Sequence, residues 1–332
     1  MNLFQGSTNM SIADKKILII GNNSGKLLIQ ESIYHPDYFL DYKTLSKLGR
    51  GVRRFWHILG IPKFCKNFIS FSVDELEKYD VIILFQCMYA ADMIQLIRKY
   101  NLHARLIYWL WNSYKGFTVS PLYNDKKIFN EICSKEFRNK FDFEIWSFDH
   151  MDCKRFNLKY NNTFCVKLKG VKPREVLYDA MFFGIDKNRL HVLKELARIF
   201  QDYGISYDIK VIPDKRKSYS KEENLYLSNL FLPYPKFVEK EMESRCLLEI
   251  VQKGQSDITW RAMEAQFYGK KLITNCTGIK RYAFYNPHNI FILGEDSLDN
   301  LVSFISTPYE KLNPNLIRKF QFDGWLENFF DN

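Results

Sequence analysis

The stretch from Cys246 to Asn275 constrains the fold of this chain more than any other part of the sequence. It begins with an almost unbroken apolar run over 246–251, which is typical of a parallel strand covered on both faces. A helical pattern follows over 259–268, and Gly269 stands where a left-handed C-cap is expected. A second apolar strand is predicted over 271–274. This order predicts an α/β fold with a parallel sheet.

Polar residues fill the interval between the first of these strands and the helix. Gln255 and Ser256 lie in the predicted loop, Thr259 opens the helix, and Arg261 and Glu264 follow within it. Ligands of open α/β sheets bind at the carboxyl ends of the strands, so these residues occupy a binding position. Helical spacing also brings Arg261 close to Glu264, and a surface ion pair is the alternative role for the two.

A second informative stretch runs from Tyr178 to Arg189. Its apolar residues predict a strand that closes at Gly184, and a helix is predicted over 189–203. Lys187 and Arg189 stand at the start of that helix, where backbone N–H groups and adjacent cations suit a diphosphate. The alternative is a helix start with solvated cations.

These two stretches, together with 282–292, resemble the nucleotide-binding half of GT-B glycosyltransferases. In that family a loop, helix and strand unit ends in Glu-Ala, then Gly, then a hydrophobic strand. The matching residues here are Glu264-Ala265, Gly269 and Leu272-Ile273-Thr274. The resemblance covers 177–330 and extends to the N-terminal half only at the level of fold. It points to bacterial enzymes of lipopolysaccharide and surface-polysaccharide synthesis.

The resemblance implies an α/β GT-B fold, with two Rossmann-like domains facing each other across a cleft. It implies that Glu264 receives the ribose hydroxyls of a nucleotide-sugar donor. Some families carry a second Glu eight residues earlier, where this chain has Ser256, so the stereochemistry of transfer is open. The donor-binding residues that the resemblance implies are Gly184, Lys187, Arg189, Gln255, Ser256, Thr259, Arg261 and Glu264.

The length of 332 residues exceeds that of a usual single core, so two domains are expected. The first, over 1–172, would be the acceptor domain, with 1–14 flexible. The second, over 177–312, would be the donor domain, reached through a linker at 171–177. The aromatic-rich segment 313–332 is expected to form a C-terminal helix that crosses back to the first domain, as in other GT-B proteins.

In the N-terminal half, apolar strands alternate with helical patterns, and polar residues follow the strands. Asn22 and Asn112 stand at two strand ends and are candidates for holding sugar hydroxyls. Asp149, His150 and Asp152 follow a third strand and are candidates for the general base of an inverting enzyme. For the two Asp residues, capping of the next helix is an equal alternative.

No metal or other cofactor is expected. The chain has no Asp-x-Asp motif, and its histidines lack the spacing of a metal site. The resemblance implies that cations and helix dipoles, and not a bound metal, stabilise the leaving group. The seven widely spaced cysteines are typical of reduced thiols in a cytosolic protein.

The net charge of +10 comes without a recognisable nucleic-acid-binding motif, so nucleic acid is not an expected partner. The segment from Tyr42 to Phe64 mixes cations with aromatic and aliphatic residues, which favours contact with an anionic membrane face. Its alternative role is an ordinary basic helix packed on the sheet. The cations concerned are Lys43, Lys47, Arg50, Arg53 and Arg54, with Phe55, Trp56 and Ile58 as the inserting residues.

The sequence therefore favours a cytoplasmic glycosyltransferase, peripheral on the inner face of the cytoplasmic membrane, because neither a secretory signal nor an apolar run long enough to span a bilayer is evident. It would move a sugar from a nucleotide sugar to a saccharide or lipid-linked saccharide of the bacterial envelope. The alternatives are a non-catalytic nucleotide-sugar-binding protein on the same frame and a GT-B-like nucleotide-sugar epimerase.

Overall fold

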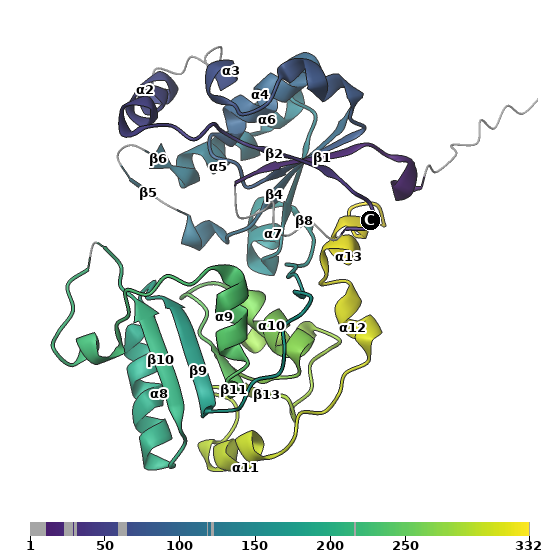
Figure 1. The fold of residues 1–332 in the computed structure, drawn as a ribbon. Coiled ribbons are helices and arrows are strands. Elements are labelled where there is room, and N and C mark those ends of the chain that lie inside the picture. The colour runs from purple at the N-terminus through teal and green to yellow at the C-terminus, as the bar shows by residue number, and fades with distance from the viewer. Residues whose placement is uncertain are drawn as a thin grey trace, which may run out of the picture. The chain divides into compact units, whose positions relative to one another are not determined.

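The computed structural model describes residues 11–22, 29, 32–58, 65–117, 119–120, 123–215 and 217–331. The chain divides into two compact units (Figure 1). The first comprises Met1–Asn162 with Phe322–Asn332, and the second comprises Thr163–Gln321. Residues 163–172, assigned from the sequence to the first domain, thus lie in the second unit. Of the N-terminal residues expected to be flexible, 1–10 lie outside the described residues, and Ser11 caps a 3-10 helix, η1 (Ile12–Asp14).

The first unit contains a parallel sheet in the order β2-β1-β3-β4-β7-β8. These strands are β1 (Ile17–Gly21), β2 (Asp37–Leu40), β3 (Val81–Phe85), β4 (Arg105–Leu110), β7 (Glu144–Ser147) and β8 (Lys159–Tyr160). The α-helices are α2 (Lys47–Ile58), α3 (Cys65–Phe68), α4 (Ala90–Tyr100), α5 (Asp125–Cys133), α6 (Lys135–Lys140), α7 (His150–Phe156) and α13 (Phe322–Glu327). Shorter elements are β5 (Val119–Ser120), β6 (Tyr123–Asn124), η3 (Val73–Lys78) and η4 (Tyr114–Gly116).

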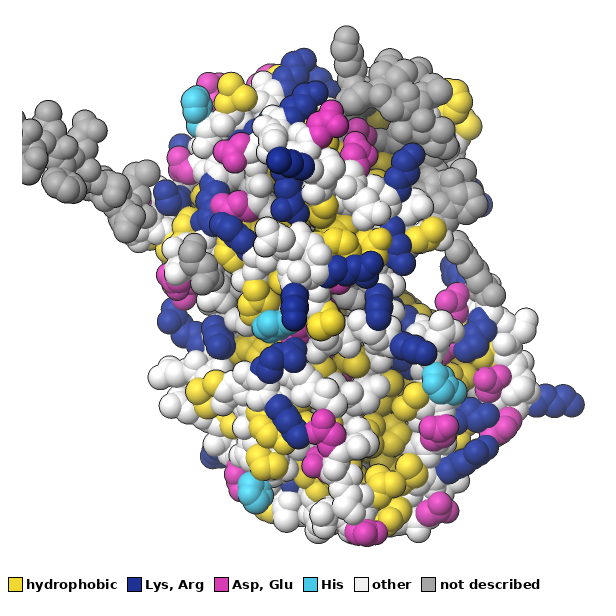
Figure 2. Space-filling model, turned by 180° about the vertical axis from the view of Figure 1, so that it is seen from behind, with side chains coloured by type: hydrophobic (Ala, Val, Ile, Leu, Met, Phe, Trp, Pro, Cys, Tyr) yellow, Lys and Arg dark blue, Asp and Glu magenta, His cyan; other side chains and the backbone are white. Residues whose placement is uncertain are grey.

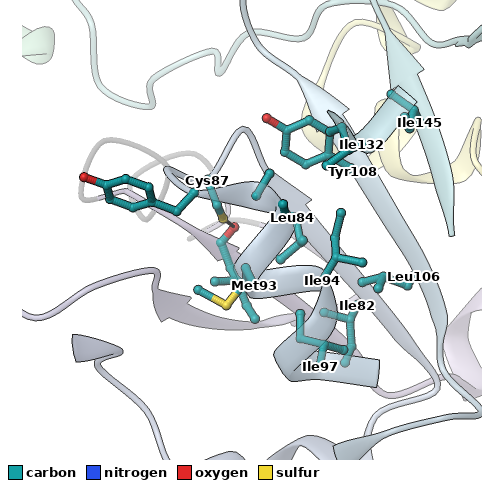
Figure 3. Packing of buried hydrophobic residues seen from close by; sticks show 14 of the residues in the cluster. Ile82, Leu84, Cys87, Met93, Ile94, Ile97, Leu106, Tyr108, Ile132 and Ile145 are labelled. Atoms are coloured by element: carbon teal, nitrogen blue, oxygen red, sulfur yellow. Dashed lines mark hydrogen bonds between the residues drawn. The ribbon is translucent and has the colours of Figure 1, made fainter. Parts of the chain in front are cut away.

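The core of the first unit lies between its sheet and α4. Every residue of β3 is buried, as the apolar run Val81–Phe85 predicts for a central parallel strand. Ile82 and Leu84 pack against Ile94 and Ile97 of α4, which stand three residues apart on one helix face (Figure 3). This packing fixes the direction of β3, so its carboxyl end meets those of β1 and β4 at one edge.

The second unit contains a parallel sheet in the order β10-β9-β11-β12-β13. Its strands are β9 (Tyr178–Ile185), β10 (Tyr207–Ile212), β11 (Ser244–Glu249), β12 (Lys271–Thr274) and β13 (Ile290–Ile292). Its helices are α8 (Leu190–Asp202), α9 (Tyr234–Glu241), α10 (Trp260–Tyr268), α11 (Leu301–Ser306) and α12 (Pro314–Arg318), with η5 (Glu223–Tyr226), η6 (Thr277–Arg281) and η7 (Leu298–Asn300). Both sheets are wholly parallel with helices between their strands, so the α/β two-unit architecture is confirmed.

The local predictions hold best where the apolar pattern is strong. Gly269 adopts the expected left-handed conformation, with φ of 63°, and ends α10 before β12. Helix α9 starts at Tyr234 and ends at Glu241, and Pro235 lies in its first turn. Proline is compatible with the first helical turn, so Pro235 does not delay the start of α9. None of the helices in the described part of the chain has the length and apolar character needed to cross a bilayer.

Candidate functional site

The strand order of the second sheet reverses between β9 and β11. In open α/β sheets, ligands bind at the carboxyl ends of the strands at such a reversal. Here β9 ends at Ile185, and Asp186 to Arg189 lead into α8. Lys187 and Asn188 both have left-handed backbone angles, with φ of 43° and 61°. The chain therefore turns tightly at the edge where a ligand is expected.

The buried carboxylate of Asp186 fixes this turn. Its Oδ1 accepts hydrogen bonds from the backbone N–H of Arg189 at 3.0 Å and of Leu190 at 2.9 Å. Its Oδ2 accepts from Lys217 Nζ at 2.8 Å and Tyr219 OH at 2.9 Å, which ties down the loop after β10. Burial alone would raise the pKa of Asp186, but the hydrogen bonds from Lys217 and from the backbone of Leu190 hold it below its usual value.

Asp186 was missed as a site residue by the sequence-based prediction. The available signal was an acidic residue directly after a buried strand and just before a helix, which is the position of a capping side chain. Its bonds to Lys217 and Tyr219 could not be anticipated, because they join residues about thirty positions apart.

Arg189 bridges the two strands at the reversal. Its Nη1 donates to Ile250 O at 3.0 Å, just after β11, and its Nη2 donates to Ile185 O at 2.5 Å, at the end of β9. The guanidinium also lies 5.1 Å from the ring centroid of Phe182. Burial and the neighbouring Arg261 guanidinium lower the pKa of Arg189 to about 10. Among the described residues, none places a carboxylate within ion-pairing distance of Arg189.

Two further predicted residues flank Arg189. Gly184 lies in β9, where a Cβ would come within 3.6 Å of Arg189 Nη2 and 3.4 Å of the Phe182 ring. Lys187 is exposed on the turn that leads into α8. The structure thus brings Gly184, Lys187 and Arg189 together at the carboxyl end of β9, with both cations at the same edge.

The loop after β11 carries Gln255 and Ser256 and is held by residues that follow β12. Asp257 is buried and accepts hydrogen bonds from Arg281 Nη2 at 2.6 Å and from Tyr282 OH at 2.9 Å. Gln255 Nε2 donates to Asp257 O at 2.8 Å. This bonding fixes the half-buried Gln255 and Ser256 at the same edge of the sheet as the Arg189 turn.

Thr259 has a structural task at the start of α10. Its Oγ1 accepts from the backbone N–H of Arg261 at 3.2 Å and donates to Glu249 Oε1 at 2.6 Å. Glu249, at the end of β11, also accepts from Thr274 Oγ1 at 2.8 Å. Burial raises the pKa of Glu249. These bonds join β11, α10 and β12 directly beneath the loop that holds Gln255 and Ser256.

Arg261 and Glu264 form part of a buried cluster, not the surface ion pair considered from the sequence. Arg261 Nε lies 2.9 Å from Glu241 Oε1 and 3.5 Å from Glu264 Oε2. Its Nη2 donates to Phe183 O at 2.8 Å. The Glu264 side chain is only 3 % exposed, so its carboxylate faces Arg261 and Glu241 instead of solvent. Glu241 was missed from the sequence because it belongs to a different helix.

The two predicted asparagines of the first unit follow β1 and β4, which are separated in the sheet by β3. Asn112 donates from its backbone N–H at 2.6 Å and from Nδ2 at 3.2 Å to Gln86 Oε1. Gln86 follows β3 in a left-handed conformation, with φ of 40°. Asn22 follows β1, and its carbonyl oxygen accepts from Tyr38 OH at 2.5 Å. Asn112 and Gln86 therefore form one polar group at the carboxyl edge of this sheet, and Gln86 was missed from the sequence.

The three candidates for a general base occupy different environments at the start of α7. Asp149 is buried and caps the helix, accepting from the backbone N–H of Met151 at 2.9 Å and of Asp152 at 3.1 Å. Asp152 is buried and accepts from the backbone N–H of Tyr114 at 2.6 Å, and burial raises its pKa. His150 is half-buried, with its ring 3.9 Å from that of Tyr160.

Two further features of the described residues are the distribution of surface charge and the grouping of side chains that could bind a metal ion. Figure 2 shows lysine and arginine side chains spread among acidic ones on the face in view, without one continuous basic patch. In the described part of the chain, no three side chains of His, Cys, Asp or Glu gather in a group that could hold a metal ion.

Comparison with known proteins finds similarity in structure but not in sequence. No protein-family model matches the chain, and no curated protein matches it in sequence. HepE of Anabaena in complex with UDP and glucose has a TM-score of 0.58 at 12% identity, covering 96% of this chain and 98% of that one. The same protein in complex with UDP-glucose gives 0.55 at 12% identity, covering 96% and 100%.

A third similar structure is the apo form of the lipopolysaccharide outer core galactosyltransferase WaaB. It has a TM-score of 0.48 at 15% identity and covers 95% of this chain and 98% of that one. At such identities a structural likeness concerns the fold. Taken with the two parallel sheets, the likeness to HepE shows that this chain has the GT-B glycosyltransferase fold.

Proposed function

We propose that this chain, which has the GT-B fold, is a metal-independent glycosyltransferase that takes its sugar from a nucleotide-sugar donor. The observation that carries the proposal is Arg189 at the reversal between β9 and β11. Its guanidinium bonds to backbone carbonyls of both strand ends, and no described carboxylate pairs with it. A partly buried cation with a lowered pKa gains most from an anionic ligand. A donor diphosphate has that charge.

The residues of the proposed donor site have different roles. Lys187 and Arg189 bind the diphosphate and stabilise the leaving nucleoside diphosphate. Their positive charges take the place of the charge that a metal ion would supply. Gln255 and Ser256 offer polar groups to the sugar or nucleoside. Gly184 leaves room beside Arg189. Thr259, Arg261 and Glu264 hold the floor of the site through β9, β11 and α10.

For Glu264 this proposal changes the expected task. The resemblance to GT-B enzymes implies direct contact with ribose, whereas the buried carboxylate faces Arg261 and Glu241. We therefore assign Glu264 a positioning task, in which it holds Arg261 against the carbonyl of Phe183. Loss of Glu264 would then weaken donor binding through Arg261.

On the acceptor side, His150 is the proposed general base. Asp149 and Asp152 already accept hydrogen bonds from backbone N–H groups, whereas the His150 side chain is an imidazole, the group that most often serves as a general base. Asn22 and Asn112 are the proposed contacts to the hydroxyls of a saccharide or lipid-linked saccharide acceptor. We place the enzyme in synthesis of bacterial envelope polysaccharide, in the cytoplasm and peripheral on the membrane.

Nucleotide binding tests the donor site. The wild type is screened by thermal shift with UDP, GDP, CMP and dTDP sugars, because a ligand that binds the native state raises its melting temperature. Lys187→Ala and Arg189→Ala should each lower the affinity for the best nucleotide by about tenfold or more, since a charged hydrogen bond contributes about 1.5–3 kcal/mol. The matched control is Arg198→Ala on α8, the helix that follows them; the Arg198 side chain is 66% exposed and pairs with Glu222.

Turnover separates the enzyme from the two alternatives. Release of nucleoside diphosphate that rises when a saccharide acceptor is added supports transfer. Binding without turnover would indicate a non-catalytic nucleotide-sugar-binding protein, and a change in the donor sugar without release would indicate an epimerase. His150→Gln should lower transfer while leaving nucleotide affinity unchanged. Failure of every nucleotide to bind would overturn the proposed function.

A further inference from the structure

Several cations of the first unit stack on aromatic rings, and some of them have a structural role. Arg53 is buried, with its guanidinium 4.8 Å from the ring centroid of Tyr42 and 5.7 Å from that of Tyr89. Arg53 thus fastens α2 to the turns that follow β2 and β3, which corrects its sequence-based assignment to a membrane face. The side chains of Arg54, Trp56 and Ile58, which were assigned to the same face, lie outside the described residues.

A second group of cations stands at the carboxyl edge of the first sheet, around Tyr114. This residue opens η4, which follows β4. Its ring packs on three phenylalanine rings, with centroids 5.6, 5.5 and 4.7 Å away, which are those of Phe117, Phe129 and Phe156. Its backbone N–H donates to Asp152 Oδ2 in α7 at 2.6 Å. Tyr114 is thereby fixed between the two segments that carry the proposed acceptor residues Asn112 and His150.

Three cations from three different elements gather at this tyrosine. Lys126 Nζ of α5 lies 5.2 Å from the Tyr114 ring centroid, and Arg155 Cζ of α7 lies 5.1 Å from it. Lys115 of η4 is the third. Burial raises the pKa of Asp152, and the nearby positive charges of Arg155 and Lys115 oppose that rise, so both lie close to the Asp152 carboxyl. We call Lys115, Lys126 and Arg155 the Tyr114 cation group.

The described acidic side chains leave this positive charge unbalanced. Among the described residues, no member of the Tyr114 cation group forms an ion pair. Lys115 and Arg155 are exposed, and Lys126 is half-buried. Asp152 is buried and already accepts from the backbone of Tyr114, and Asp125 stands in the first turn of α5, where the helix dipole favours its charge. Like charges held close together repel, so an anion bound among the three cations would relieve that repulsion.

We propose that the Tyr114 cation group binds a phosphate group carried by the acceptor, so that the acceptor is a phosphorylated saccharide. The inference rests on the proposed function and deepens it by naming the chemical class of the acceptor. Phosphate oxygens form charge-assisted hydrogen bonds with Lys and Arg side chains. Three cations around one ring suit a single phosphate group, whereas nucleic acid is bound by cations spread along a stripe or a helix. A phosphate held there places the sugar that bears it beside Asn112 and His150.

Titration calorimetry of the full chain with glucose 6-phosphate, and with glucose as the uncharged probe, tests the proposal without turnover. The wild type should bind glucose 6-phosphate about tenfold more tightly than glucose or better, and the difference should shrink as salt is added. The triple variant Lys115→Ser/Lys126→Ser/Arg155→Ser should lose about tenfold or more in affinity for glucose 6-phosphate. Lys115→Ser alone, which changes no ring contact of Tyr114, should lose about threefold. Arg189→Ala should keep the wild-type affinity, because it changes the donor site alone.

The matched control removes three other cations of the first unit that stack on rings. Lys78, Lys99 and Lys140 lie 5.0, 5.6 and 5.3 Å from the ring centroids of Tyr79, Tyr100 and Phe141. Their joint replacement by Ser changes the net charge by the same amount and should leave the affinity for glucose 6-phosphate unchanged. Circular dichroism and melting temperature confirm that each variant is folded.

Four results would overturn the proposal. They are equal affinity for glucose 6-phosphate and glucose, unchanged affinity in the triple variant, an equal loss in the control, and a loss in Arg189→Ala that the triple variant does not share. The last would place the anion at the donor site. Binding of duplex DNA without binding of glucose 6-phosphate would overturn it as well and assign the group to nucleic acid. Nucleotide affinity tests the transferase proposal separately, so failure of one proposal is distinguishable from failure of the other.

Discussion

Arg261 Nε lies 2.9 Å from Glu241 Oε1, and this contact joins α10 to the end of α9 inside the second unit. Glu264 Oε2 lies 3.5 Å from the same nitrogen, so one guanidinium stands between two buried carboxyl groups. Burial and the neighbouring Glu264 raise the pKa of Glu241 well above its usual value. Burial also raises the pKa of Glu264, although Arg261 opposes the change. The two carboxyl groups therefore release their protons at a higher pH than exposed glutamates do.

These raised pKa values make the stability of the second unit depend on pH. A carboxyl whose pKa is higher in the folded chain stabilises the fold fully below the unfolded-state value of about 4.3. That contribution is lost as the pH rises through the raised folded-state pKa, at about 1.4 kcal/mol per pH unit for one proton. Because Gln is neutral throughout, Glu241→Gln should flatten the fall in unfolding free energy as the pH rises above the unfolded-state pKa of about 4.3.

Urea unfolding of the second unit at several pH values measures this slope. The control is Glu239→Gln on the same helix, because Glu239 pairs with Lys236 at the surface and its pKa is lowered by that hydrogen bond. The control should keep the slope of the wild type over this pH range. If the wild type and Glu241→Gln had the same slope, the Glu241–Glu264 pair would not be the source of the pH dependence.

Gly278 permits the loop after β12 to approach the loop that holds Gln255 and Ser256. A Cβ at Gly278 would overlap the backbone oxygen of Ser256 and Nη2 of Arg281. Gly278→Ala should therefore displace the Ser256–Asp257 loop and cost about 1–3 kcal/mol. Nucleotide affinity should fall as well, if the loop forms part of the donor site.

Denaturant unfolding and nucleotide titration together check this variant. Gly51→Ala is the control, since no atom lies within 4 Å of a Cβ at that position in α2. The control should be at least as stable as the wild type, because Ala is the better helix former. Unchanged stability and affinity for Gly278→Ala would argue that the loop has room to move away.

Asp186 connects the turn after β9 with the loop after β10. Asp186→Asn keeps the shape of the side chain but weakens the pair with Lys217 Nζ, and we expect a loss of about 1–3 kcal/mol. The pKa of Asp186 lies below its usual value in the folded chain. Its contribution is therefore present above the unfolded-state pKa of about 3.9 and is lost as the pH falls through the folded-state value.

The wild type and Asp186→Asn should thus differ most at neutral pH and converge in acid. Melting curves between about pH 3 and pH 7 measure the difference. Asp202→Asn, at the exposed end of α8, is the control and should stay within about 0.5 kcal/mol of the wild type at every pH. A difference for Asp186→Asn that persists at the lowest pH would mean that shape, not charge, is what Asp186 supplies.

The sequence predicts those parts of the fold that a local pattern determines. The strand Val81–Phe85 has the bounds expected from its apolar run, because the polar residues Asp80 and Gln86 on either side cannot extend a buried strand. β2 (Asp37–Leu40) was missed, because it is a half-exposed edge strand without a continuous apolar run. The start of α9 at Tyr234 lacks such a local signal, because prolines favour a loop in sequence and yet fit the first turn of a helix.

The candidate site was predictable only in part, for a related reason. Lys187 and Arg189 could be placed at the end of β9, since strand and helix patterns meet there. The contacts that give these residues their surroundings join distant segments, such as Asp186 with Lys217, Arg261 with Glu241, and Gly278 with Ser256. No local pattern encodes such pairs. The chemistry of the site therefore depends on packing that only the folded structure displays.

The C-terminal residues from Phe322 onward belong to the first unit, although the second unit separates them in sequence from the rest of it. Trp325 is fully buried, and its ring lies 5.1 Å from that of Trp109 in β4 and 4.8 Å from that of Phe329. Its backbone oxygen accepts from Asn161 Nδ2 at 2.9 Å. Trp325→Ala should therefore cost the first unit about 3–5 kcal/mol, the usual loss for a buried large aromatic residue.

Hydrogen exchange measures this effect separately in each unit. Amides of β3 and β4 should exchange faster in Trp325→Ala, while those of β11 and β12 should keep the protection of the wild type, because the two units have separate cores. Phe330→Ala is the control, since its half-buried ring should cost less and change protection only slightly. Faster exchange in β11 and β12 but not in β3 and β4 would contradict the assignment of this segment to the first unit.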